Sequence, residues 1–161
     1  MVKLRYILIA GITIITIAFG FIRDSLFKHI NYQIYQLETS TDKIIESDLY
    51  QLIFKNLSLD HLHYSKWILT IAFMIIYYAL TTTGIRLIYN TKKYDRLILI
   101  IFSTIFVVSG LSYIIGDLSN NLAIGYRFSR LFMGAIQSPF ILLILIPGIK
   151  FFEDKTVSLK D

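Results

Sequence analysis

The sequence predicts an all-α membrane protein, a four-transmembrane-helix bundle, and three observations lead to this fold class. Hydrophobic residues make up 55% of the 161 residues, charged residues only 17%, and the apolar residues gather in four uncharged stretches. Each stretch has 17 to 20 residues, close to the roughly 20 that a helix needs to cross a bilayer. Because lipid offers no partners to bare peptide groups, such stretches must be helical. The expected spans are about residues 6–22, 67–85, 97–116 and 131–149, in a single integral membrane domain over residues 1–161.

Basic residues predict the orientation of the spans. Nine of the 16 Lys and Arg residues lie in the N-terminal tail, the short loop between the second and third spans, and the C-terminal tail. The remaining seven are spread over the two longer connections on the other side. The positive-inside rule therefore puts both termini on the cytoplasmic side of the membrane. We expect this membrane to be a bacterial inner membrane.

The first span has a second interpretation. Lys3 and Arg5 precede its apolar core, and Ala18-Phe19-Gly20 loosely resembles a signal-peptide cleavage site. Its apolar run is longer than the usual core of a signal peptide. We therefore expect a retained membrane anchor, with cleavage as the alternative.

Residues 23–66 form the predicted extracytoplasmic loop between the first two spans, and this segment contains no Gly or Pro. Apolar residues recur near helical spacing in two parts of it, which predicts two amphipathic helices that lie on the outer leaflet or cap the bundle. The first set is Leu26, Phe27, Ile30, Ile34 and Leu37, and the second is Leu49, Leu52, Ile53, Leu57 and Leu59.

Arginines mark two outer boundaries. Arg23-Asp24 follows the first span, while Tyr126, Arg127 and Arg130 precede the fourth. A guanidinium group offers a rigid fork to a carboxylate or phosphate, so these residues are candidates for binding a partner or an anion. The alternative is ordinary anchoring at the membrane interface.

The fourth span carries Gln137-Ser138-Pro139 and a second proline, Pro147. Pro139 has no N–H to offer the carbonyl of Ala135, so a kink is expected there. Gln137 or Ser138 is then available for a local hydrogen bond or one to a neighbouring helix. A helix contact is the favoured interpretation, and a ligand or transport site built on the kink is the alternative.

Small residues in the second and third spans predict a close helix contact. They are Thr81-Thr82-Thr83-Gly84 in the second span, and Ser103-Thr104 and Ser109-Gly110 in the third. Small side chains let two membrane helices approach closely. We expect them to form the contact between these two spans.

Several kinds of chemistry lack a signature in the sequence. There is no cysteine, no GxSxG, HExxH or P-loop motif, and no ionisable residue at the centre of an expected span. His29 stands alone, and the His61-Leu62-His63 pair has only Asp60 near it, so no metal site is expected. The basic residues flank spans instead of forming a stripe, which argues against a nucleic-acid partner. We expect no cofactor and no catalytic residues.

Two short motifs and the layout of the spans resemble a known family. The motifs are Arg23-Asp24-Ser25-Leu26-Phe27 after the first span and Tyr126-Arg127-Phe128-Ser129-Arg130 before the fourth, which continues as Gln137-Ser138-Pro139 and ends near Pro147. With them, the chain resembles the small exosortase F system-associated membrane proteins of Bacteroidetes. The resemblance implies a non-catalytic accessory of a membrane-embedded sorting enzyme, with Arg23, Arg127 and Arg130 as candidate contacts.

The sequence therefore favours an accessory or scaffold subunit that binds another integral membrane protein within the lipid bilayer, in protein sorting. Two alternatives stay open: a lipid- or small-molecule-binding channel or transporter subunit that uses the kink at Pro139, and a membrane-embedded enzyme that acts at the outer interface.

Overall fold

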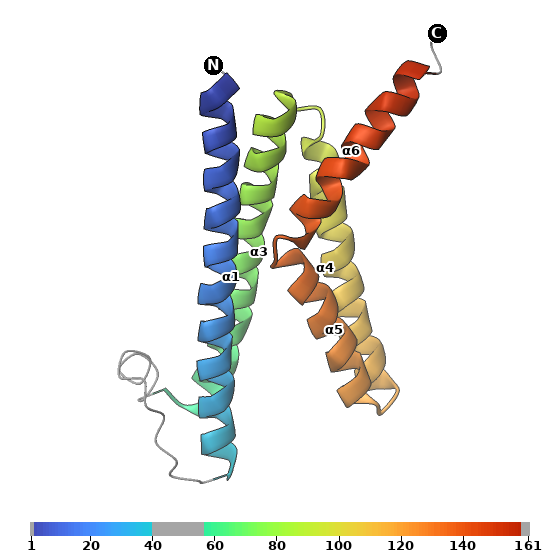
Figure 1. The fold of residues 1–161 in the computed structure, drawn as a ribbon. Helices are drawn as coiled ribbons and strands as arrows, with labels where there is room; N and C mark the ends of the chain where they lie inside the picture. Colours follow the sequence, from blue (N-terminus) through green and yellow to red (C-terminus); the bar gives the residue numbers. More distant parts are fainter. Residues whose placement is uncertain (1, 40–56, 159–161) are drawn as a thin grey trace.

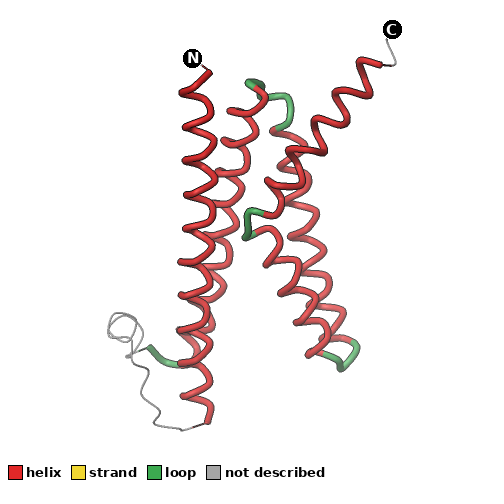
Figure 2. Tube along the Cα trace, viewed as in Figure 1, coloured by secondary structure: helices red, strands yellow, loops and turns green. Residues whose placement is uncertain are grey.

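The structure is a computed structural model that describes residues 2–39 and 57–158. This part of the chain folds almost entirely into helices joined by short loops (Figure 2). The helices are α1 (Val2–Thr39), α3 (Leu59–Tyr89), α4 (Asp95–Leu118), α5 (Leu122–Ile136) and α6 (Phe140–Ser158). The prediction of an all-α protein is confirmed.

The helices form two antiparallel pairs, α1 with α3 and α4 with α5 (Figure 1). The pairs contact each other near the middle of α3 and diverge toward the end at which α5 begins. Both termini and the turn between α3 and α4 lie at the opposite end. The described basic residues of the two tails and of this turn are therefore gathered at one end of the molecule.

Three helices, α1, α3 and α4, are long and apolar enough to cross a membrane. A fourth crossing is made by α5 and α6 if they count as one span, because they pass the same test together but are bent by 62°. The α5–α6 pair leads from the far end back to the end that holds the termini (Figure 1). The structure thus shows a multi-pass membrane protein with three or four spans.

Helix α1 is longer than the first expected span. At 38 residues and about 1.5 Å per residue, it is roughly 57 Å long, nearly twice the thickness of the hydrocarbon core. The first predicted amphipathic helix is a direct continuation of the span, so the predicted boundary at residue 23 is not a helix end. Its buried Ile30 and Ile34 pack with Leu62 of α3. Most of the second predicted helix lies outside the described residues.

The connection between the third and fourth expected spans, residues 117–130, is shorter in the structure than the span bounds predict. Helix α5 begins at Leu122, so the segment from Gly125 to Arg130 is helical. Asn120 has a positive φ of 54°, a conformation that asparagine tolerates better than most residues. It lets the chain reverse between α4 and α5 within three residues, 119–121.

Glycines allow α4 and α5 to touch along their backbones. A Cβ atom at Gly116 would lie 2.5 Å from the Cα of Gly125, and one at Gly125 would lie 2.6 Å from the Cα of Gly116. Farther along the same contact, Ser109 Oγ donates to the carbonyl of Ser129 at 3.0 Å. The small residue Ser109 therefore faces α5, and the prediction that it faces α3 is wrong.

Gly84 of α3 likewise lies closest to helices other than α4. A Cβ atom there would lie 3.2 Å from the side chain of Leu142 in α6 and 3.6 Å from that of Ile12 in α1. Helices α3 and α4 instead contact through larger groups, including Tyr78 and Phe102, whose rings meet edge to face at 5.5 Å. The small residues predicted to join the second and third spans thus contact other helices: Ser109 contacts α5, and Gly84 lies against α6 and α1.

Candidate functional site at the break between α5 and α6

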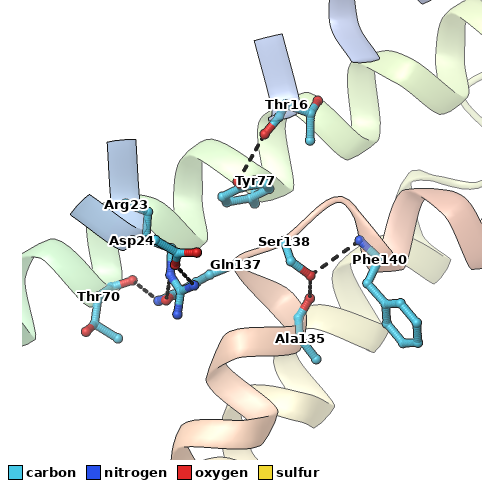
Figure 3. A network of polar contacts seen from close by, with 9 residues as sticks. All are labelled: Thr16, Arg23, Asp24, Thr70, Tyr77, Ala135, Gln137, Ser138 and Phe140. Carbon is cyan, nitrogen blue, oxygen red and sulfur yellow. Dashed lines mark hydrogen bonds and ion pairs between the residues drawn. The ribbon is translucent and has the colours of Figure 1, made fainter. Parts of the chain in front are cut away.

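The backbone is interrupted between Ile136, the last residue of α5, and Phe140, the first of α6. Ser138 satisfies the carbonyl that Pro139 leaves without a partner, because its Oγ donates to Ala135 O at 2.8 Å. The same Oγ accepts from the Phe140 N–H at 3.3 Å (Figure 3). A single hydroxyl therefore bonds both helix ends at the break.

Gln137 connects the break to the other helix pair. Its side chain is buried, with 1% of the residue exposed. Nε2 donates to the carbonyl of Thr70 in α3 at 2.7 Å, and Oε1 accepts from Nε of Arg23 in α1 at 2.9 Å (Figure 3). One amide thus joins three parts of the chain. Sequence analysis anticipated a contact from Gln137 to a neighbouring helix but named neither partner.

Arg23 is held by three groups around its guanidinium. Besides Gln137, Asp24 Oδ1 accepts from Nη1 at 2.9 Å, and the ring of Phe27 lies 5.6 Å away. A Cβ atom at Gly134 would lie 4.0 Å from Nη2, so the cation lies beside the last turn of α5. Since the carbonyl end of a helix carries partial negative charge, this location favours a cation.

Asp24 is much more exposed than its partner. The Asp24 side chain is 75% exposed, against 20% for Arg23. Its only hydrogen bond in the described part of the chain is the one to Arg23. The pair therefore has a partly buried cationic half and an exposed anionic half.

A second polar contact joins α1 to α3 two turns away. The hydroxyl of Tyr77, whose side chain is fully buried, donates to the carbonyl of Thr16 at 3.1 Å (Figure 3). A Cβ atom at Gly20 would lie 3.3 Å from this hydroxyl. Gly20 therefore gives the tyrosine room to reach the backbone of α1.

The contacts of α3 with α4 indicate how far along the bundle Gln137 meets Arg23 and Thr70. Tyr78 contacts Phe102 of α4, and Thr70 lies eight residues nearer the start of α3. At about 1.5 Å per residue, this separation is roughly 12 Å. The Thr70–Gln137 contact is then level with the half of the apolar stretch 97–116 of α4 that lies beyond Phe102.

Helix α5 also leads to the apolar stretch 97–116 of α4, although to its first half. Ser129 contacts Ser109 of α4, and Gln137 follows eight residues later, roughly 12 Å back toward the end that holds the termini. Both routes put the Arg23–Gln137 contact alongside the apolar stretch of α4. Arg23 thus bonds Gln137, which lies six residues inside the expected span 131–149, and its location at the outer boundary stays a prediction. An ionisable residue packed against apolar helices is a candidate functional site.

The outer arginines are not part of this network. Tyr126, Arg127 and Arg130 lie on exposed positions of α5, and in the described residues no hydrogen bond or ion pair joins Arg127 or Arg130 to Arg23. Pro147 lies inside α6 without ending it. The predicted set of residues thus separates into an internal group at Arg23 and an exposed group on α5.

Sequence analysis missed Thr70, and it named Phe27 without its contact to Arg23. Thr70 contributes a backbone carbonyl, which no sequence pattern marks. Phe27 does carry a signal, because Thr16, Arg23 and Phe27 are separated by seven and four residues and so share one face of a helix. That face only becomes visible once α1 is extended past residue 22.

The described residues contain no cluster of metal-binding side chains. Among residues 2–39 and 57–158, no group of three or more His, Asp or Glu side chains is placed to hold a metal ion. His61 Nδ1 lies 2.6 Å from Ser58 Oγ, next to the start of α3. Comparison of the chain with family models, curated proteins and solved structures finds no match. The arrangement around Arg23 is suited to holding helices together and presenting one carboxylate.

Proposed function

We propose that this protein is a non-catalytic accessory subunit of a bacterial inner-membrane complex and that it binds another integral membrane protein. The observation that carries the proposal is the exposed carboxylate of Asp24, level with the apolar stretch of α4. Charged side chains at such depth are costly when they face lipid and are usually paired or covered by protein. A partner helix over Asp24 removes that cost.

The proposed orientation has both termini in the cytoplasm. Figure 1 has the termini and the α3–α4 turn at one end, and the sequence carries Lys92, Lys93 and Arg96 in or next to that turn. Short cytoplasmic connections are enriched in such residues. An exosortase-type protein-sorting system is the complex that the family resemblance implies.

Transport is the second candidate, and the observation that favours it is the broken α5–α6 span. Discontinuous helices form the binding sites of many transporters, where free helix ends hold the substrate. Here, however, Ser138 bonds both helix ends and Gln137 bonds Arg23 and Thr70. The polar groups at the break are therefore hydrogen-bonded within the chain and not free to bind a substrate, so the break is better suited to joining the helices.

Co-purification tests the proposed function. The tagged full chain, extracted from the membranes of its host in mild detergent, should migrate with a second integral membrane protein in a fixed ratio. Asp24→Ala should reduce this ratio, whereas Asp117→Ala, at an exposed acid near the end of α4, should leave it unchanged. A chain that migrates alone in mild detergent and gives no cross-linked product in membranes would overturn the proposal.

Flux measurements test the second candidate. Proteoliposomes that contain only this chain should show no flux of small anions or cations above that of empty vesicles. Flux that Gln137→Ala abolishes would favour a transporter over an accessory subunit.

A further inference from the structure

One face of α1 is exposed over several turns and carries Asp24. Its members are Ile7, Ile14, Ile17, Phe21, Asp24 and Lys28, all exposed, and from Ile14 onward they are three or four residues apart. The buried residues of α1, Thr16, Ile30 and Ile34, lie on another side, toward α3. We call the six exposed positions the Asp24 face.

The spacing of the Asp24 face suits one long helix as its cover. Ile7, Ile14, Phe21 and Lys28 recur every seven residues, and Ile17 and Asp24 recur at the same interval between them. Two helices that cross at a shallow angle meet through positions with this period. Apolar side chains at these positions are equally suited to lipid, so Asp24 decides between lipid and a protein partner.

The charge of Asp24 is only partly balanced within the chain. Arg23 donates one hydrogen bond to it, but the same guanidinium also bonds Gln137 and lies beside the carbonyl end of α5. Lys28, one turn farther along the same face, makes no ion pair with Asp24 in the described residues. The exposed side of the Asp24 carboxylate is therefore open to a group from outside the chain. At this depth a cation satisfies the carboxylate better than a neutral group does.

A second copy of this chain supplies such a cation poorly, because its Lys28 would lie one turn away from Asp24, level with the other Lys28. A twofold interface brings the same residues of both subunits together, so two parallel copies that meet through the Asp24 face would set one Asp24 near the other. Like charges at that depth repel strongly. The complementary occupant is therefore a different helix with a basic side chain.

We infer that the Asp24 face docks a single transmembrane helix of another protein and that this helix carries an Arg or Lys level with Asp24. The inference rests on the proposed function and adds to it the surface and the chemistry of the partner.

Site-specific photo-cross-linking in native membranes tests the surface. A photoreactive phenylalanine analogue replaces Phe21, which is 73% exposed on the Asp24 face, and in a matched control replaces Leu111, which is 50% exposed on α4. Cross-links from position 21 should map by mass spectrometry to a transmembrane segment that contains Arg or Lys, while position 111 should capture mainly lipid.

Charge exchange tests the chemistry. With the cross-linker at position 21, Asp24→Lys should lower the yield by about tenfold or more. Asp24→Asn, which keeps an oxygen for Arg23 and so protects the fold, should also lower it. Replacing the partner's basic residue by Asp should restore the yield with Asp24→Lys.

The remaining outcomes overturn the inference. These are cross-links from position 21 to lipid alone, to a second copy of this chain, or to a segment without Arg or Lys, and a yield that Asp24→Lys does not change. Partner capture from position 111 alone would overturn the inference but leave the proposed function standing. If no partner is captured from either position and none co-purifies, both fail.

Discussion

Arg23 Nε donates a hydrogen bond to Gln137 Oε1 at 2.9 Å, across 114 positions of sequence. The bond joins α1 to the break in the last span at the depth of the apolar part of α4. It explains why a polar amide is tolerated in an apolar stretch. It also means that the stability of the bundle depends on two side chains that look unrelated in the sequence.

Replacing Gln137 should weaken the whole bundle. Gln137→Leu removes the acceptor of Arg23 and the donor to Thr70, and we expect a loss of about 1–3 kcal/mol in the free energy of unfolding. Thr83→Val is the matched control, because the exposed Thr83 hydroxyl bonds only to Ala79 in its own helix. Unfolding in mixed detergent micelles measures both variants, and equal stability of the two would count against the network.

The contact between α4 and α5 should not tolerate a methyl group. Gly116→Ala sets a Cβ atom 2.5 Å from the backbone of Gly125, and neither backbone has a flexible end that can move aside. We expect a loss of about 2 kcal/mol or more. Gly110→Ala, on the same helix with nothing within 4 Å of the added atom, should be neutral or slightly stabilising. Thermal unfolding in detergent distinguishes the two, and similar melting temperatures would contradict the packing.

The bend between α5 and α6 should depend on Pro139. Pro139→Ala restores the N–H that can bond Ala135 O, and Ser138→Ala removes the hydroxyl that now satisfies this carbonyl. The double variant should therefore be straighter than the 62° bend of the native pair. Spin labels at Arg130 and Ile144, both exposed, report the change as a longer distance. An unchanged distance would mean that packing, and not proline, sets the bend.

Alkaline pH should loosen the end of the molecule that holds the termini. The hydroxyl of Tyr94, between α3 and α4, donates to the carboxylate of Glu153 in α6, and this bond raises the pKa of Tyr94 to about 12. Since the folded pKa lies above the ordinary value of about 10, the bond stabilises the fold fully below pH 10. Its contribution is lost as the pH rises through about 12.

Tyrosinate absorbance tests this assignment. The difference between the titrations of the native protein and of Tyr94→Phe should contain one group with a pKa near 12. Tyr94→Phe should also lose less stability than the native protein between pH 10 and pH 12. A difference titration centred near pH 10 would contradict the hydrogen bond.

Much of the fold could be predicted from the sequence because membrane helices are strongly constrained. The apolar stretches near residues 67–85 and 97–116 fall inside α3 and α4, and the kink at Pro139 follows from its missing N–H. The end of α1 could not be predicted in the same way. Polar residues after Arg23 mark a change of environment, but without Gly or Pro they do not end a helix.

The candidate site was only partly predictable for a related reason. Arg23, Asp24 and Gln137 were identified as polar residues next to or within spans, yet sequence analysis grouped Arg23 with Arg127 and Arg130 because all three precede or follow a span. The grouping in the structure depends on which residues share a face of α1 and on the depth at which α5 ends. The first follows from the unbroken period of α1, and the second from the close α4–α5 contact at Gly116 and Gly125.

The central claim is that Asp24 lies at membrane depth on an exposed face, and depth measurement by spin label tests it most directly. Because the chain has no cysteine, Asp24→Cys carries a single label, with Ile14→Cys and Thr39→Cys on exposed positions of α1 as references. In lipid bilayers, the label at position 24 should collide with oxygen more than with a water-soluble nickel complex, as at position 14. Collision with the nickel complex as frequent as at position 39 would put Asp24 in water and contradict the account.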